Sequence, residues 1–262
     1  MQVTFLGTGS AMQTGDRMQT GLLLSSGRQC LLVDCGSGIL HRLANTDVGY
    51  EGVGSILLTH HHLDHVADLL PLLKARWLAG EDHLEIVGPK GTKALVDGLL
   101  SVHDYLDGRV DLRIREVTAG QPFEVAGFRV EGHETRHSMD GLAYRFAEAV
   151  DSEAAEAADA EAESLAFVFS GDSEAFAGLA RFADGCRVLA HDCSFPDGVD
   201  VSGHPTPTQL GQVLTDCTVD RLYLTHLYPH TDGNHEAMRE AIAAGGFDGE
   251  IRVARDGLRV EF

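Results

Sequence analysis

The chain has 262 residues, which is long enough to bury a sizeable core in one α/β domain. Hydrophobic residues make up 44% of the sequence, and no run approaches the roughly 18 consecutive apolar residues that a membrane-spanning helix needs. The formal net charge is −20, from 40 acidic and 20 basic residues, which argues against a large phosphate-binding face. We therefore expect a cytoplasmic protein with no membrane segment.

The basic residues are nearly all arginine, and the lysines are Lys74, Lys90 and Lys93. An acidic, lysine-poor surface predicts a halophilic protein, because salt screens the repulsion between like charges. An acidic protein from an ordinary cytoplasm is the alternative. The five cysteines contain no C-x-x-C spacing and cannot all pair, so we expect free thiols in a reducing compartment.

The N-terminal part of the chain predicts strands at residues 3–6, 22–24 and 30–33, followed by a short helix at 39–44. Gly7-Thr8-Gly9 follows the first strand, and we interpret it as a tight turn rather than a dinucleotide fingerprint. The third strand ends at Asp34.

The segment from Thr59 to His65 is the most informative stretch of the sequence. It follows an apolar run at 55–58 that predicts a buried strand, and it precedes a helix predicted for 66–79, which Pro71 would kink or break. Four potential ligands lie on this one loop: His60, His62, Asp64 and His65. Neutral imidazole and carboxylate oxygen bind zinc and related ions, so the spacing predicts a metal site rather than a solvated histidine-rich loop.

Further elements follow along the chain. We expect a strand at 84–87, a helix to about residue 106, a strand at 112–117 and a hairpin at 123–130. His137 precedes a strand predicted for 142–146, and His133 is close enough to compete with it as a ligand. Residues 148–164 are rich in Ala, Glu and Asp and predict an acidic insert, either a loop or a protruding helix.

The last third alternates strands and helices, and its strands deliver polar residues at their ends. Strands predicted for 166–169 and 187–190 lead to Asp172 and to His191-Asp192, and a strand at 222–226 ends in His226. Helices are expected at 174–182, from 207, and at 235–244. We expect the chain to close with a hairpin of residues 251–253 and 258–262. This order of elements predicts a layered α/β fold.

His60-x-His62-x-Asp64-His65 resembles the signature of the metallo-β-lactamase superfamily, in its hydrolase branch. Four more phrases resemble its ribonuclease Z-like group: Phe5-Leu6-Gly7-Thr8-Gly9-Ser10, Ser170-Gly171-Asp172-Ser173, His191-Asp192-Cys193-Ser194 and Gly203-His204-Pro205-Thr206. The resemblance implies a four-layer αββα sandwich that covers residues 1–262 as a single domain. It also suggests a homodimer.

The resemblance also implies a ligand set for two divalent ions, expected to be Zn²⁺, with Mn²⁺ or Fe²⁺ as alternatives. One ion is assigned His60, His62 and His137; the other is assigned Asp64, His65 and His226, with Asp172 bridging the two. Two such ions promote hydroxide formation near neutral pH. Asp64 is expected to orient or deprotonate the water. His204 is expected to act as the general acid, with Asp192 holding its ring, and Asp34 to support a ligand histidine.

The leading functional prediction is a phosphodiesterase that acts on a small or cyclic phosphodiester. In ribonuclease Z, a basic arm that binds transfer RNA is inserted in the interval that is acidic here. Transfer-RNA 3′-processing is therefore the disfavoured alternative, and a nucleic-acid partner is disfavoured for the same reason. Thioester or lactone hydrolysis is a second alternative. A non-catalytic metal-binding protein is the non-enzyme alternative, and His62 disfavours iron redox chemistry.

Overall fold

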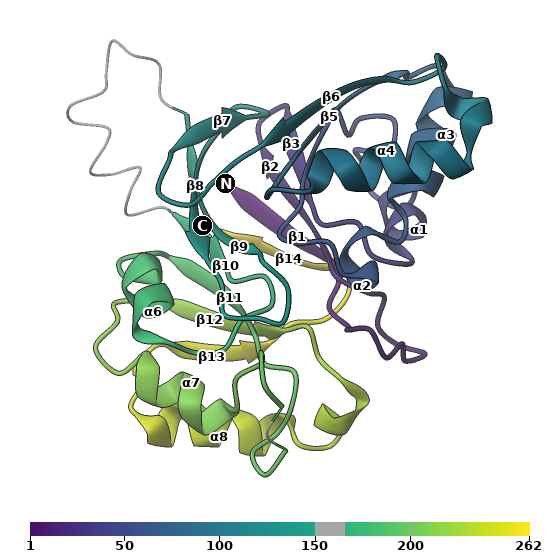
Figure 1. Cartoon of the computed structure of the whole chain (residues 1–262). Coiled ribbons are helices and arrows are strands. Elements are labelled where there is room, and N and C mark those ends of the chain that lie inside the picture. The colour runs from purple at the N-terminus through teal and green to yellow at the C-terminus, as the bar shows by residue number, and fades with distance from the viewer. Residues whose placement is uncertain (150–165, 200) are drawn as a thin grey trace.

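The computed structural model describes residues 1–149, 166–199 and 201–262. In this part of the chain two seven-stranded sheets pack face to face, and helices cover their outer faces (Figure 1). The layers therefore run helices, sheet, sheet, helices, and the predicted α/β sandwich is confirmed. The expected insert at 148–164 lies almost wholly outside the described residues; only its first two positions belong to them.

The first sheet has the strand order β14-β1-β2-β3-β4-β5-β6. Its strands are β1 (Gln2–Gly7), β2 (Gly21–Ser26), β3 (Gln29–Val33), β4 (Ser55–Leu57), β5 (His83–Gly88), β6 (Asp111–Glu116) and β14 (Leu258–Glu261). Its helices are α1 (Ile39–Leu43), α2 (Leu63–Val66), α3 (Leu69–Ala79), α4 (Thr92–Val102) and the 3₁₀ turn η1 (Asp104–Leu106).

The second sheet has the order β13-β12-β11-β10-β9-β8-β7. Its strands are β7 (Phe123–Val125), β8 (Phe128–Glu134), β9 (Leu142–Glu148), β10 (Phe167–Phe169), β11 (Val188–Asp192), β12 (Arg221–Thr225) and β13 (Glu250–Val253). Helices α6 (Ala177–Ala183), α7 (Pro207–Val213) and α8 (His235–Gly245) cover its outer face, and the 3₁₀ turn η2 (Pro229–Thr231) follows β12.

Alternation along the strands builds the core. In β12, Tyr223 belongs to the apolar cluster between the two sheets, whereas Leu222 and Leu224 belong to the cluster under α7 and α8. In β9, Tyr144 and Phe146 likewise point between the sheets. Successive side chains of a strand face opposite sides, so strands that are covered on both faces are apolar almost throughout.

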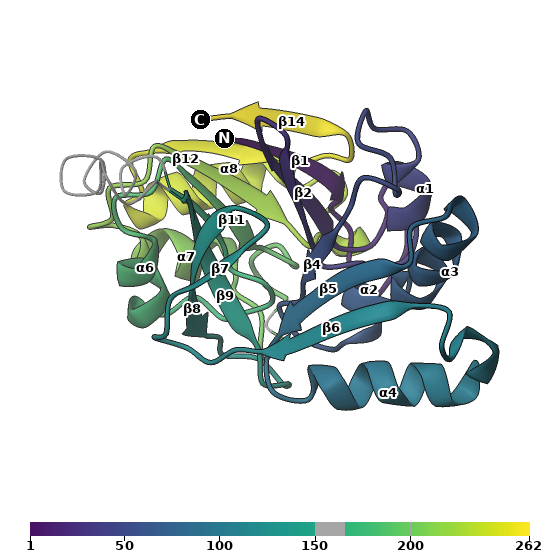
Figure 2. The ribbon, with the colours of Figure 1, turned by 90° about the horizontal axis from the view of Figure 1, so that it is seen from above.

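The predicted C-terminal hairpin is wrong, because β13 and β14 belong to different sheets. β13 pairs in parallel with β12, whereas β14 pairs antiparallel with β1 and places the C-terminus beside the N-terminus (Figure 2). The turn between them is tied to the N-terminal half: Asp256 accepts hydrogen bonds from the amide of Thr8 at 3.0 Å and from the amide of Met18 at 2.7 Å. These contacts span most of the chain and leave no local sequence signal.

The helix predicted for 66–79 is two helices. α2 begins at Leu63 inside the histidine motif, and α3 begins at Leu69. Pro71 lies in the first turn of α3, where its missing N–H leaves no hydrogen bond unmade. Asp68 lies at the junction, and its carboxylate accepts hydrogen bonds from the amides of Gly38 and Leu40, both at 2.9 Å. None of the helices in the described ranges is long and apolar enough to cross a bilayer.

Candidate metal centre

The loop after β4 is anchored by Asp34, which follows β3. The Asp34 carboxylate accepts hydrogen bonds from the Thr59 amide at 2.7 Å and from the Thr59 hydroxyl at 2.8 Å. Asp34 is fully buried and has a positive φ of 60°, an unusual conformation for a residue other than glycine. The strands β3 and β4 are parallel neighbours, so their carboxyl ends bring these two residues together.

The first candidate ligand group consists of His60, His62, His137 and Asp172. The Nδ1 atom of His62 lies 3.1 Å from both His60 Nε2 and His137 Nε2. The Asp172 carboxylate is 3.7 Å from His60 Nε2 and 3.8 Å from His137 Nε2. Three imidazole nitrogens and one carboxylate oxygen that converge in this way match the donor number of a four-coordinate zinc site.

The second candidate group consists of Asp64, His65, Asp172 and His226, and it shares Asp172 with the first. His226 Nε2 lies 3.0 Å from Asp64 Oδ2 and 3.2 Å from Asp172 Oδ2. His65 Nε2 lies 3.2 Å from Asp172 Oδ1. In each group the potential ligand atoms lie within 4.8 Å of one another. The structure thus brings together all seven residues that the sequence analysis assigned to metal binding.

Four of the histidines are oriented through their Nδ1 atoms, which leaves Nε2 facing the centre. The Nδ1 atom of His60 lies 3.1 Å from the Thr59 hydroxyl, and the Nδ1 atom of His65 lies 2.7 Å from the Asp34 carboxylate. The Nδ1 atom of His137 lies 3.0 Å from the Gly203 carbonyl, and the Nδ1 atom of His226 lies 3.0 Å from the Ser194 hydroxyl. Such partners fix the tautomer and the ring orientation of metal-binding histidines. The expected support by Asp34 is seen here as its contact with His65.

Charge in the centre favours cations. Two buried carboxylates, from Asp64 and Asp172, belong to the ligand groups, and the buried carboxylates of Asp34 and Asp192 lie behind His65 and His204. Burial lowers the pKa of His60 well below its usual range and lowers that of His62, so both rings stay neutral near pH 7, which is the form that binds metal. Burial alone would raise the pKa of Asp172, but the adjacent histidines hold it well below its usual range.

Two buried atoms in the centre indicate where a metal would fit. His65 Nε2 and Asp172 Oδ1 are inaccessible to solvent; they lie 3.2 Å from each other, but neither makes a well-aligned hydrogen bond within the described residues. Buried polar atoms are rarely left unpaired in native proteins. Because both atoms belong to the second ligand group, the donor set fits a divalent cation. These observations support divalent metal binding.

His204 lies beside this centre and is held by Asp192. The Nδ1 atom of His204 is 2.6 Å from the Asp192 carboxylate, and the ring stacks on that of His226 with 5.6 Å between centroids. Burial would lower the pKa of His204, but the charge of Asp192 and the hydrogen bond to it raise that pKa to about 9. The other Asp192 oxygen accepts a hydrogen bond from the Ser194 hydroxyl at 2.6 Å.

The backbone conformation and the close surroundings of position 203 explain why a glycine precedes His204. Its φ is +91°, and a Cβ atom at this position would lie 2.9 Å from His137 Nδ1, which is too close. The carbonyl of Gly203 is the partner of that same nitrogen. Any larger residue would therefore push His137 away from the centre.

Some functional positions were not found from the sequence. Thr59, Ser194 and the Gly203 carbonyl had no assigned role, because each acts on a histidine that is brought near only by the fold. Ser194 is two residues from Asp192 and belongs to the phrase His191-Asp192-Cys193-Ser194, and these two signals point to it. His133, the competitor of His137, packs its ring against Phe176 and Phe182 and belongs to neither ligand group.

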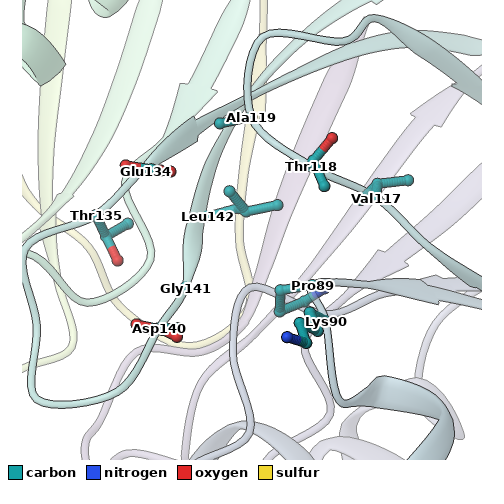
Figure 3. Close-up of a pocket in the computed structure, with 10 residues that line it drawn as sticks. All are labelled: Pro89, Lys90, Val117, Thr118, Ala119, Glu134, Thr135, Asp140, Gly141 and Leu142. Carbon is teal, nitrogen blue, oxygen red and sulfur yellow. The ribbon is translucent and has the colours of Figure 1, made fainter.

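A separate pocket of about 280 Å³ adjoins the β8–β9 loop (Figure 3). It is lined by residues after β5, after β6 and around the β8–β9 loop: Pro89, Lys90, Val117, Thr118, Ala119, Glu134, Thr135, Asp140, Gly141 and Leu142. Lys90 faces this pocket together with Glu134 and Asp140, so its charge is mixed. None of these residues belongs to the ligand groups.

Known proteins resemble this chain in sequence over most or all of its length. A family model described as "Anti-Pycsar protein Apyc1" matches residues 1–244. Ribonuclease Z of Methanopyrus kandleri is 33% identical, over 98% of this chain and 96% of the relative. Ribonuclease Z of Mycolicibacterium gilvum is 29% identical, over 100% of this chain and 96% of the relative.

Solved structures show the same fold. The metallo-β-lactamase fold protein YhfI from Bacillus subtilis superimposes with a TM-score of 0.81 at 25% identity, over 100% of this chain and 99% of that one. Zn²⁺-bound PqqB from Methylobacterium extorquens gives a TM-score of 0.76 at 18% identity, over 100% of both chains.

Proposed function

The chain belongs to the family described as Anti-Pycsar protein Apyc1 and, with its ribonuclease Z relatives, to the ribonuclease Z-like branch of the metallo-β-lactamase superfamily; on this premise we propose that it is a two-metal phosphodiesterase that hydrolyses a small or cyclic phosphodiester. The broader assignment, a metal-dependent hydrolase, follows from the family. The choice of a phosphodiester and of a small substrate is the proposal.

One observation carries the proposal: the two ligand groups share the Asp172 carboxylate. His60, His62 and His137 would hold one ion, Asp64, His65 and His226 the other, and Asp172 would bridge them. When bound, two such ions supply Lewis acidity toward a phosphoryl oxygen and make a nucleophile available from water at neutral pH. We take the ions to be zinc, because five of the seven ligand side chains are imidazoles.

Asp64 and His204 supply the proton transfers on this account. Asp64 Oδ2 lies 3.0 Å from His226 Nε2, and its carboxylate would accept a hydrogen bond from the attacking water and orient it. His204 would donate a proton from Nε2 to the leaving oxygen, because Asp192 occupies its Nδ1. Since Asp192 raises the pKa of His204 to about 9, the imidazole is protonated near neutral pH and ready to donate.

Surface charge supports a small substrate. The net charge of −20 opposes the approach of a polyanionic RNA, and this repulsion weakens as salt increases. The ribonuclease Z relatives favour the second candidate function, an endonuclease that processes transfer RNA. A cytoplasmic location, a halophilic host and a homodimer remain part of the proposal.

Comparing the hydrolysis of three substrates distinguishes the small-substrate phosphodiesterase from the transfer-RNA endonuclease. We would measure kcat/KM for bis(p-nitrophenyl) phosphate, for a 3′,5′-cyclic nucleotide and for a 3′-extended transfer RNA, each at low and molar salt. The proposal predicts turnover of the first two and at most trace cleavage of the RNA at low salt, with the His204→Ala variant losing most activity on the cyclic nucleotide. Efficient cleavage of the RNA with no turnover of either small diester would overturn it in favour of the endonuclease.

A further inference from the structure

Aromatic rings form one side of the surroundings of His204. Phe195 follows β11, and Tyr228 lies two residues after His226; their ring centroids are 4.5 Å apart and their planes meet at 26°, so the rings are stacked. Phe195 is only 6% exposed, whereas Tyr228 is half-buried. Phe195 therefore backs the Tyr228 ring, and part of Tyr228 remains open to solvent.

The Tyr228 ring lies next to His204, which would protonate the leaving oxygen, and next to the candidate metal ligand His226. Its centroid is 6.0 Å from that of His204 and 5.8 Å from that of His226, with the ring planes near perpendicular in both pairs. The ring centroids of Phe195 and His204 are 5.9 Å apart. Because His204 is the proposed proton donor, these two aromatic rings stand on the leaving-group side of the substrate.

Backbone contacts hold Tyr228 in place. Its amide donates a hydrogen bond to the Ser194 carbonyl at 3.2 Å, and the preceding amide, of Leu227, donates to the Thr8 carbonyl at 2.9 Å. His226 has a positive φ of 56°, which turns the chain sharply at the end of β12. These contacts fix the backbone that carries the ring, and stacking on Phe195 restrains the ring itself, so little conformational entropy is lost when it contacts a ligand.

We propose that Tyr228, backed by Phe195, determines which leaving groups the enzyme accepts. It favours an alcohol or phenol that has a planar ring close to its leaving oxygen. Aromatic rings attract one another in offset-stacked or edge-to-face arrangements, and an alkyl leaving group offers no such contact. Tyr228 would touch the substrate, and Phe195 is a positioning residue that acts through it. This inference rests on the proposed function, which places His204 on the leaving-group side.

A binding measurement tests the ring contact without turnover. We would determine Kd by calorimetry for phenylphosphonate and methylphosphonate with the wild type and with Tyr228→Leu, Tyr228→Phe and Tyr105→Leu. The last is a matched control at an exposed tyrosine whose ring lies against Lys74 and His103. Tyr228→Leu should reduce the preference for phenylphosphonate by about 2- to 12-fold, as expected for the loss of one aromatic pair. Tyr228→Phe and the control should keep it. An unchanged preference in Tyr228→Leu, or an equal loss in Tyr228→Phe, would overturn the inference.

A kinetic measurement tests the side on which the ring is bound. Bis(p-nitrophenyl) phosphate and methyl p-nitrophenyl phosphate share the leaving group p-nitrophenol and differ in the group that is retained. Tyr228→Leu should raise KM for both by the same factor; a loss confined to the first diester would place Tyr228 on the retained side and refute the assignment. If the wild type hydrolyses neither diester, the proposed function fails, while the phosphonate preference still tests the ring contact.

The role of Phe195 is tested by a double variant. Because Phe195 acts through Tyr228, the Phe195→Leu variant should weaken the preference for phenylphosphonate, and combining it with Tyr228→Leu should cost nothing beyond Tyr228→Leu alone. Additive losses would show that Phe195 contacts the ligand by itself and would refute its positioning role.

Discussion

Replacement of Asp192 by Asn should move the alkaline limit of the reaction toward lower pH. Asp192 is fully buried and lies 2.6 Å from His204 Nδ1. It raises the pKa of His204 from 6.5 to about 9, so the protonated imidazole persists through neutral pH and is lost as the pH rises through about 9. Without the carboxylate, only the charges of Asp172 and Asp64 oppose burial, so the pKa of His204 should fall from about 9 toward its ordinary value.

The size of the effect follows from the protonated fractions. At pH 8 a group with a pKa of about 9 is about 90% protonated, whereas one with a pKa of 6.5 is about 3% protonated. Asp192→Asn should therefore lower kcat by up to about 30-fold at pH 8 and by much less at pH 6, as expected for a general acid. The loss applies to substrates whose leaving alcohol needs a proton.

The assay is a pH profile of kcat with two classes of diester. A 3′,5′-cyclic nucleotide has a poor leaving group, whereas bis(p-nitrophenyl) phosphate releases a phenolate that needs little protonation and serves as the control. Metal content would be measured in parallel, because Asp192 also contacts Ser194, which orients His226. An equal loss on both substrates at every pH, with metal retained, would refute the role of His204 as general acid.

Three further predictions concern the scaffold of the centre. Asp172→Asn removes the shared ligand and should reduce bound metal below two ions per chain, with kcat falling at least about 100-fold, as determined by elemental analysis and steady-state kinetics. Asp34→Ala removes the partner of His65 and should weaken metal affinity by about 10- to 100-fold in a chelator competition; unchanged affinity would contradict its supporting role. Gly203→Ala should displace His137 and lower metal affinity, and it should also lower Tm because alanine is strained at a φ of +91°; a variant with wild-type affinity would show that the loop adjusts freely.

How much could be predicted from sequence depended on how local each signal was. His60, His62, Asp64 and His65 lie within six residues, so their spacing alone indicated a metal site. Asp172, His226 and His204 lie far away along the chain, and only the resemblance to a family connected them with the motif. Their convergence arises because the parallel strands β10, β11 and β12 end at the same edge of the second sheet.

The features that escaped prediction depend on contacts between distant segments. The separation of β13 from β14 follows from hydrogen bonds between Asp256 and residues more than 200 positions away, so the apparent hairpin was wrong. The orientation of His60 and His226 by Thr59 and Ser194 depends on hydroxyl groups that sequence patterns do not distinguish from ordinary loop residues. Predicted elements were therefore more dependable than predicted pairings.

The most direct test of the account is metal content by mass spectrometry, measured together with hydrolysis of bis(p-nitrophenyl) phosphate by the wild type and by Asp64→Ala. The account predicts about two divalent ions per wild-type chain, turnover that disappears on chelation and returns on adding metal, and loss of turnover in the variant. Diester turnover by a metal-free chain would contradict the account, and so would two bound ions without any phosphodiester turnover.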